Sequence, residues 1–213
     1  MKPILIVYAT RGGYTRRIAE RIADRIRTLR HEAQIQDART EALPPLDRYS
    51  AVVLAASLHL GQHEQEMVRF ARSRRGELAA LPTLFVSVSL TEAAAADVHR
   101  PDGERLEARR AVRKALDDFE RETGWRPRKS VPVAGALTET AYGPVRRSLL
   151  TRLVRRDAPE EPSRQGAFTD WAALDALVDA LVGRAVELST TAPPAAPAPA
   201  RVRGAVDGRP PVP

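Results

Sequence analysis

An apolar run, a polar loop and a helical repeat follow one another directly near the start of the chain, and this order constrains the fold more than any other feature. Residues 4–8 are apolar, and isoleucines recur at positions 18, 22 and 26, as they would on one helix face. The loop between them, residues 10–15, reads TRGGYT. Its threonine hydroxyls, its two glycines and the positive end of the following helix are the parts of a phosphate site. We therefore predict a strand, a phosphate-binding loop and a helix.

The spacing within this loop excludes two common nucleotide-binding motifs. The loop matches neither GxGxxG nor GxxxxGK[ST], so neither the Rossmann fingerprint nor the P-loop is present. It is similar instead to the flavodoxin signature, which is carried here by Val7, Tyr8, Thr10, Gly13, Thr15, Ala19 and Ile22. The alternative is a buried first strand followed by an ordinary polar turn.

Composition limits the function classes that remain. The chain has no cysteine, which excludes disulfides, thiolate metal sites and cysteine catalysis. No apolar run approaches the ~20 residues that span a bilayer, and the start shows no signal peptide, so we expect a cytoplasmic protein. The net charge of +7, mostly from arginine, favours anionic partners, which include nucleic acid, anionic lipid and carboxylated ligands. We expect no nucleic-acid partner.

The rest of the chain alternates between strand and helix patterns. Strands are expected at residues 4–8, 33–37, 51–57, 83–90 and 131–137, and helices at 14–30, 62–75, 104–123 and 170–188. Residues 91–103 are expected to form a loop of small residues. The apolar face of helix 104–123 is expected to be Leu106, Val112, Leu116 and Phe119. This alternation predicts an α/β, flavodoxin-like, doubly wound sheet of five parallel strands in the order 2-1-3-4-5, with helices on both faces.

Ligands of such a sheet bind beyond the carboxyl ends of the strands, where the strand order reverses. Three loops converge there, at residues 10–15, 57–61 and 87–91, and flavin mononucleotide (FMN) suits that geometry. His59, in the second loop, could lie over the flavin ring, shuttle a proton or bind an anionic substrate, or it could simply be solvated. His63 could join it at a metal, but two histidines without carboxylates make a poor site, so we predict no metal.

An insertion separates the fifth strand from the last helix. Residues 138–168 fill a connection that usually has ~2–6 residues, and a basic amphipathic helix is predicted within residues 144–156. This helix could lie on an anionic membrane, hold a carboxylated ring-shaped substrate, or pack its leucines on the domain. Residues 1–188 are expected to form one domain, and the proline-rich residues 189–213 a disordered tail.

Later motifs, taken in order, narrow the resemblance. They are Tyr8-x-Thr10-Arg11-x-Gly13-x-Thr15, Ala55-Ala56-Ser57 with Gly61-Gln62-His63, Ser87-Val88-x-Leu90, Trp125-Arg126-Pro127, Ala134-Gly135-Ala136-Leu137 and Phe168-Thr169-Asp170-Trp171. With them, the chain resembles the flavodoxin-like, menaquinone-dependent protoporphyrinogen IX dehydrogenase family of bacterial haem biosynthesis. The resemblance covers residues 1 to about 188.

The resemblance implies a cofactor, two substrates and a location. The cofactor is FMN, the reductant is a protoporphyrinogen-type tetrapyrrole, and the acceptor is a membrane quinone at the anionic inner face of the cell membrane. If the family's binding residues are transferred to the matching positions of this sequence, the phosphate would be held by Thr10, Arg11, Gly12, Gly13, Tyr14 and Thr15. The ring would be framed by Ser57, Leu58, His59, Leu60 and Gly61 together with Ser87, Val88, Ser89 and Leu90. Substrate or membrane would contact Arg146, Arg147, Leu149, Leu150, Arg152, Leu153, Arg155 and Arg156. Because the flavin carries the chemistry, no single catalytic side chain is predicted.

Two departures from the family leave other functions open. The second loop reads Leu58-His59-Leu60 where the family tends to carry arginine and an aromatic residue, and the insertion has few aromatic residues. The alternatives are a flavodoxin-type electron carrier, a general FMN quinone reductase without a tetrapyrrole substrate, and a binding module that has lost its flavin. The oligomeric state is left open, with a homodimer as one alternative.

Overall fold

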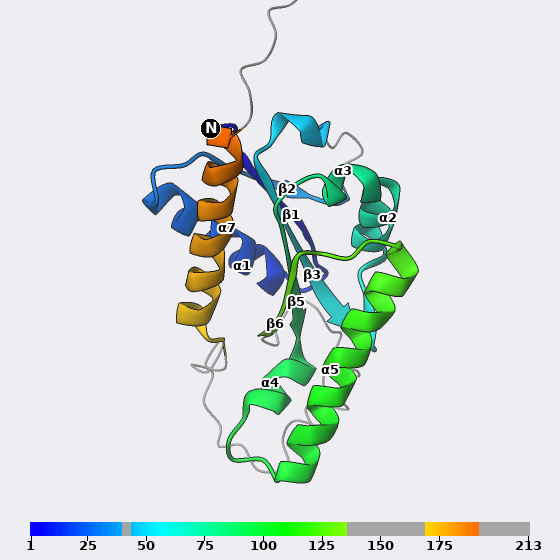
Figure 1. Ribbon diagram of the computed structural model, residues 1–213. Helices are drawn as coiled ribbons and strands as arrows, with labels where there is room; N and C mark the ends of the chain where they lie inside the picture. The colour runs from blue at the N-terminus through cyan, green and yellow to red at the C-terminus, as the bar shows by residue number, and fades with distance from the viewer. Residues whose placement is uncertain (40–43, 136–168, 192–213) are drawn as a thin grey trace, which may run out of the picture.

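A computed structural model describes residues 1–39, 44–135 and 169–191 of the chain (Figure 1). Five parallel strands form the central sheet in the order β2-β1-β3-β5-β6. They are β1 (Ile4–Ala9), β2 (Ala33–Asp37), β3 (Ala51–His59), β5 (Thr83–Ser89) and β6 (Lys129–Ala134). The predicted parallel sheet and its order are confirmed. The addition is β4 (Gln62–His63), which pairs antiparallel with the end of β3.

Helices cover both faces of this sheet. On one face lie α1 (Tyr14–Thr28) and α7 (Trp171–Thr191), and on the other α2 (Gln65–Ser73), α3 (Arg75–Ala79) and α5 (Asp102–Thr123) (Figure 1). A short 3-10 helix, η1 (Leu46–Arg48), precedes β3. Successive residues of β1 point to opposite faces, so Ile4 and Ile6 enter the core under α1 and α7, while Leu5 and Val7 enter the other core. The strands read as continuous apolar runs because both faces are covered.

Several predicted element bounds differ from the structure, among them the ends of α1 at Thr28, of β3 at His59 and of β6 at Ala134. Residues 90–96, within the expected small-residue loop, form α4 (Leu90–Ala96), because alanine-rich sequence follows Ser89, whose hydroxyl accepts a hydrogen bond from the amide of Glu92 at 2.9 Å. The second helix begins only at Gln65, because the residues before it pair with β3, and it ends at Ser73. The last helix continues to Thr191.

Leu106 is a further correction, since it was expected to face the core but is 49% exposed. The 22 residues of α5 span about 33 Å, whereas the seven residues of β5 span about 23 Å. The first part of α5 therefore extends past the sheet and lies beside α4 (Figure 1). Val112 and Phe119, farther along the helix, are buried as expected.

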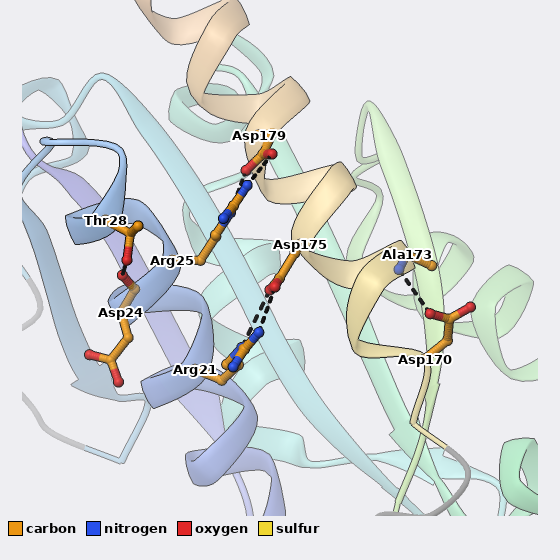
Figure 2. Close-up of polar contacts among 8 residues, drawn as sticks. All are labelled: Arg21, Asp24, Arg25, Thr28, Asp170, Ala173, Asp175 and Asp179. Atoms are coloured by element: carbon orange, nitrogen blue, oxygen red, sulfur yellow. Dashed lines mark hydrogen bonds and ion pairs between the residues drawn. The ribbon is translucent and has the colours of Figure 1, made fainter.

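Two ion pairs fasten α7 to α1 (Figure 2). Arg21 Nη2 donates to Asp175 Oδ2 at 2.6 Å, and Arg25 Nη2 donates to Asp179 Oδ2 at 2.5 Å. In each pair a second bond joins Nε to Oδ1, so both are bidentate. The partners are spaced four residues apart on each helix, which places each set on one helix face.

The start of α7 is fixed close to the first loop. Asp170 Oδ1 accepts a hydrogen bond from the Ala173 amide at 2.9 Å, which caps the helix (Figure 2). The Thr169 hydroxyl donates to the Ala134 carbonyl at 2.9 Å and bonds to the Tyr14 hydroxyl at 3.0 Å. The point at which the chain returns from the insertion is thus tied to the end of β6 and to the start of α1.

The predicted amphipathic helix of residues 144–156 lies outside the described residues, as do residues 192–213 of the predicted tail. Both assignments stay predictions. No helix in the described ranges is long and apolar enough to cross a membrane.

Candidate functional site

The predicted site lies where three neighbouring parallel strands end. Ala9 of β1 is in register with Ala56 of β3, and Ser57 of β3 is in register with Val88 of β5. The carboxyl ends of these strands therefore lie at the same edge of the sheet. The predicted segments 10–15, 57–61 and 87–90 lie at these strand ends, and residues 57–59 and 87–89 still belong to β3 and β5.

The first segment, residues 10–15, is shaped like an anion cradle. Thr10 Oγ1 accepts a hydrogen bond from the Gly13 amide at 3.1 Å. Gly13 has φ 81°, in the left-handed region that glycine tolerates, and it precedes α1 without a side-chain cap. The first turn of α1 contains no acidic residue. The amides that begin α1 therefore present their partial positive charge to whatever lies beyond them.

Thr15 adds a hydroxyl group to this cradle. The residue is 1% exposed, and its Oγ1 has no hydrogen-bond partner among the described residues. Buried polar atoms are usually paired, because an unmet hydrogen bond costs about 1–3 kcal/mol. A phosphate oxygen at the start of α1 would supply the missing partner, so these residues fit a bound phosphate group.

The second segment, residues 57–61, is the first half of a hairpin. Leu58 pairs with His63 and His59 with Gln62. Leu60 and Gly61 form the turn with φ 51° and 80°, both positive, as a two-residue type I′ turn requires. The Leu60 side chain is 81% exposed at the tip. The hairpin therefore carries the predicted ring-contacting residues out beyond the sheet edge.

In the third segment, residues 87–90, most side chains are engaged within the protein. Ser87 is 1% exposed and its Oγ lies 2.8 Å from His63 Nε2. Val88 is buried in the core with α1 and α7, and Ser89 caps α4. Leu90, the first residue of α4, is half-buried. Ser87 and Ser89 thus use their hydroxyls to hold the fold together at the site's edge.

Two residues that the sequence did not single out for the site meet the predicted loops. His63 is 5% exposed and lies against the stacked rings of Phe85 and Phe119, with centroid distances of 5.2 and 5.0 Å. Burial lowers its pKa to about 4, so the imidazole is neutral near pH 7. The sequence offered His63 as a partner for His59 at a metal and as part of the Gly61-Gln62-His63 motif, and the structure shows it as a buried anchor for the hairpin. Gly61, which comes soon after the apolar run of residues 51–58, was the available signal for a turn before His63.

Glu64 is the second of these residues, and it links two of the loops. Its side chain is 4% exposed. Oε2 accepts a hydrogen bond from Arg11 Nε at 2.9 Å, and Oε1 accepts one from Ser57 Oγ at 3.0 Å. The Glu64 amide donates to the Ser57 carbonyl at 3.2 Å. Sequence spacing gave no signal for these contacts.

Comparisons with known proteins agree with this geometry. The family model for the flavodoxin domain matches residues 5–163, a range that contains all three segments. The protoporphyrinogen IX dehydrogenase [quinone] of Escherichia coli strain K12 is 26% identical over 168 residues, covering 78% of this chain and 87% of that protein. The protein of the same name from Leishmania major is 27% identical over 175 residues, covering 80% and 70% respectively.

A solved structure supports the fold. A short-chain flavodoxin associated with a bacterial microcompartment superposes with a TM-score of 0.52, at 16% identity, and covers 87% of this chain and 99% of that chain.

Proposed function

The chain belongs to the flavodoxin domain family, and from this premise we propose that it is an FMN-dependent dehydrogenase that oxidises protoporphyrinogen IX, or a close tetrapyrrole, and passes the electrons to a membrane quinone. Support for the substrates comes from the two relatives described above, whose shared name states both the donor and the acceptor class. Each of them matches over more than two thirds of its own length.

The cradle at the start of α1 is the observation that carries the cofactor proposal. One helix N-terminus, with a buried Thr15 hydroxyl that has no hydrogen-bond partner in the described part of the chain, suits a terminal phosphate monoester. FMN ends in such a group, whereas the phosphates of FAD are bridged to an adenosine. We therefore assign FMN, with Thr10, Thr15 and the amides of Tyr14 and Thr15 at the phosphate. Heat-released flavin from the purified protein, identified by mass, tests this assignment.

The chain's own contribution is binding and orientation. When bound, FMN supplies the two-electron chemistry that links donor to acceptor. Residues 57–61 of the β3–β4 hairpin and residues 87–90 would hold the ring at the sheet edge. His63 does not serve as a proton donor in this account, because it is buried and its Nε2 is engaged by Ser87.

The insertion is proposed to bring the site to its substrates. Five arginines within residues 144–156 provide a positive charge that suits anionic headgroups or the carboxylates of a tetrapyrrole. We propose that the protein associates peripherally with the inner face of the cell membrane through this segment. Deletion of residues 143–156 should abolish binding to vesicles that contain anionic lipid, while deletion of residues 192–213 should leave it unchanged.

Anaerobic mixing of the flavin-loaded protein with protoporphyrinogen tests the reaction. Rapid bleaching of the flavin band, reversed by a menaquinone analogue, is the expected result. The alternative function is a flavodoxin-type carrier or a general quinone reductase, a reading favoured by the fold shared with a flavodoxin. It predicts flavin that stays oxidised with protoporphyrinogen and is bleached only by a reductase or a nicotinamide donor.

A further inference from the structure

We propose that Glu64 is a positioning residue that holds the phosphate loop, residues 10–15, and the β3–β4 hairpin at one fixed spacing and thereby sets the affinity for FMN. The inference rests on the proposed function, because it concerns the same flavin site. The inference goes beyond the proposed function because it assigns a role to a residue that lies outside the predicted ligand contacts.

The contacts of Glu64 reach both loops at once. One carboxylate oxygen bonds to Arg11 in the phosphate loop, and the other bonds to Ser57 at the base of the hairpin. The amide of Glu64 bonds to the Ser57 carbonyl at 3.2 Å, which fixes the carboxylate relative to the hairpin. Its own carbonyl accepts hydrogen bonds from Met67 and Val68 at the start of α2. Glu64 is therefore held in place by Ser57 and by the start of α2. Arg11 connects it to the phosphate loop.

The side chain of Glu64 is far more buried than that of its partner Arg11. The Glu64 side chain is 4% exposed, whereas that of Arg11 is 67% exposed. A carboxylate taken out of water needs charged or hydrogen-bonding partners, and here the two bonds supply them. An exposed arginine gains little stability from an ion pair but loses the rotational freedom of a long side chain. The pair consequently contributes more to the placement of Arg11 than to the stability of the fold.

Placement matters at this position because a ligand between the two loops must touch both. The phosphate would bind at the start of α1, and the ring would lie against the hairpin. The spacing between these two contacts is set by Arg11, Glu64 and Ser57. Preorganised loops bind a ligand more tightly, because less order has to be created in the protein on binding.

The test is a double-mutant cycle on FMN affinity, measured by quenching of flavin fluorescence on titration with apoprotein. Arg11→Ala and Glu64→Ala should each raise the FMN dissociation constant about tenfold, and the double variant should raise it no further than about twofold beyond either single variant. Glu64→Gln, which keeps hydrogen-bonding atoms in place, should recover part of the loss. Glu66→Ala is the matched control, because Glu66 lies in the first turn of α2 and forms its ion pair with Arg69, at 3.5 Å, rather than bridging the two loops.

Two results would overturn the inference. One is an FMN affinity for Arg11→Ala and Glu64→Ala within twofold of the Glu66→Ala control. The other is a double variant whose loss equals the product of the single losses, which would mean that the two residues act independently. Arg11 is exposed, so Arg11→Ala tests the inference even if Glu64→Ala fails to fold. A wild-type protein that binds no FMN would instead contradict the proposed function.

Discussion

Arg11 and Glu64 are separated by 53 positions in the chain, yet Arg11 Nε donates a hydrogen bond to Glu64 Oε2 at 2.9 Å. The bond joins the loop after β1 to the residue that follows the β3–β4 hairpin. This loop and this hairpin contain two of the three segments that were predicted to contact a flavin. The candidate site is therefore held together by a polar contact before any ligand is considered.

Two threonines of the phosphate loop should separate ligand binding from folding. Thr15 Oγ1 has no partner among the described residues, so Thr15→Val should leave the free energy of unfolding of the apoprotein unchanged or slightly higher, while FMN affinity falls about tenfold. Thr10→Val should lower both quantities, because Thr10 Oγ1 also accepts a hydrogen bond from the Gly13 amide. Urea unfolding and FMN titration of the two variants make the comparison. Equal FMN affinity in wild type and Thr15→Val would argue against the phosphate assignment.

The buried His63 should make the protein sensitive to mild acid. Its pKa is lowered by burial from the ordinary value of 6.5 to about 4, so the unfolded chain takes up a proton first as the pH falls. Stability from this residue is complete above pH ~6.5 and is lost as the pH falls from there toward 4. Between pH 7 and 4.5, the wild type should lose about 2–3 kcal/mol more unfolding free energy than His63→Gln. Parallel losses in both proteins would show that His63 does not contribute.

The hairpin tip should tolerate asparagine better than its natural leucine. Leu60 has φ 51°, a left-handed conformation that costs most residues about 1–2 kcal/mol. Asn-Gly is the preferred sequence for this turn. Leu60→Asn should therefore raise the free energy of unfolding by about 0.5–1 kcal/mol, whereas the β-branched Leu60→Val should lower it. A stabilising effect of valine would be inconsistent with a type I′ turn at this position.

The ion pairs between α1 and α7 should contribute modestly and in a salt-dependent way. Asp179→Asn and Asp175→Asn should each lower the free energy of unfolding by up to about 1 kcal/mol, because the partners are partly exposed. Glu20→Gln, which breaks the exposed pair with Arg16 within α1, serves as the control and should cost about 0.3 kcal/mol. The differences should shrink in 1 M NaCl. Losses that persist undiminished at high salt would point to packing rather than charge.

Much of the fold could be predicted because buried parallel strands leave a simple signal in the sequence. The bounds of β2, residues 33–37, were predicted without error, and the strand order followed from the alternation of strands and helices. The first helix was placed by its isoleucine spacing, and Ile18, Ile22 and Ile26 are all fully buried. The spacing of apolar residues was sufficient to predict an element wherever that element packs against the core along its whole length.

The misses have two physical causes. The first cause of an unpredicted feature is local backbone chemistry, as in the capping of α4 by Ser89 and the Leu-Gly turn of the hairpin. The other is contact between distant residues, as in Arg11 with Glu64 and His63 with Ser87. Such contacts depend on how strand ends are brought together in three dimensions, and no spacing in a single sequence encodes them. The polar links that hold the candidate site therefore became visible only in the structure.

The most direct test of the central claim is a titration of the apoprotein with FMN and, separately, with riboflavin, which lacks the phosphate. If the start of α1 binds the cofactor through its phosphate, FMN should bind at least about a hundredfold more tightly than riboflavin, a difference of roughly 2.7 kcal/mol. Thr15→Val should narrow that difference. Equal affinity for the two flavins, or no binding of either, would contradict the claim.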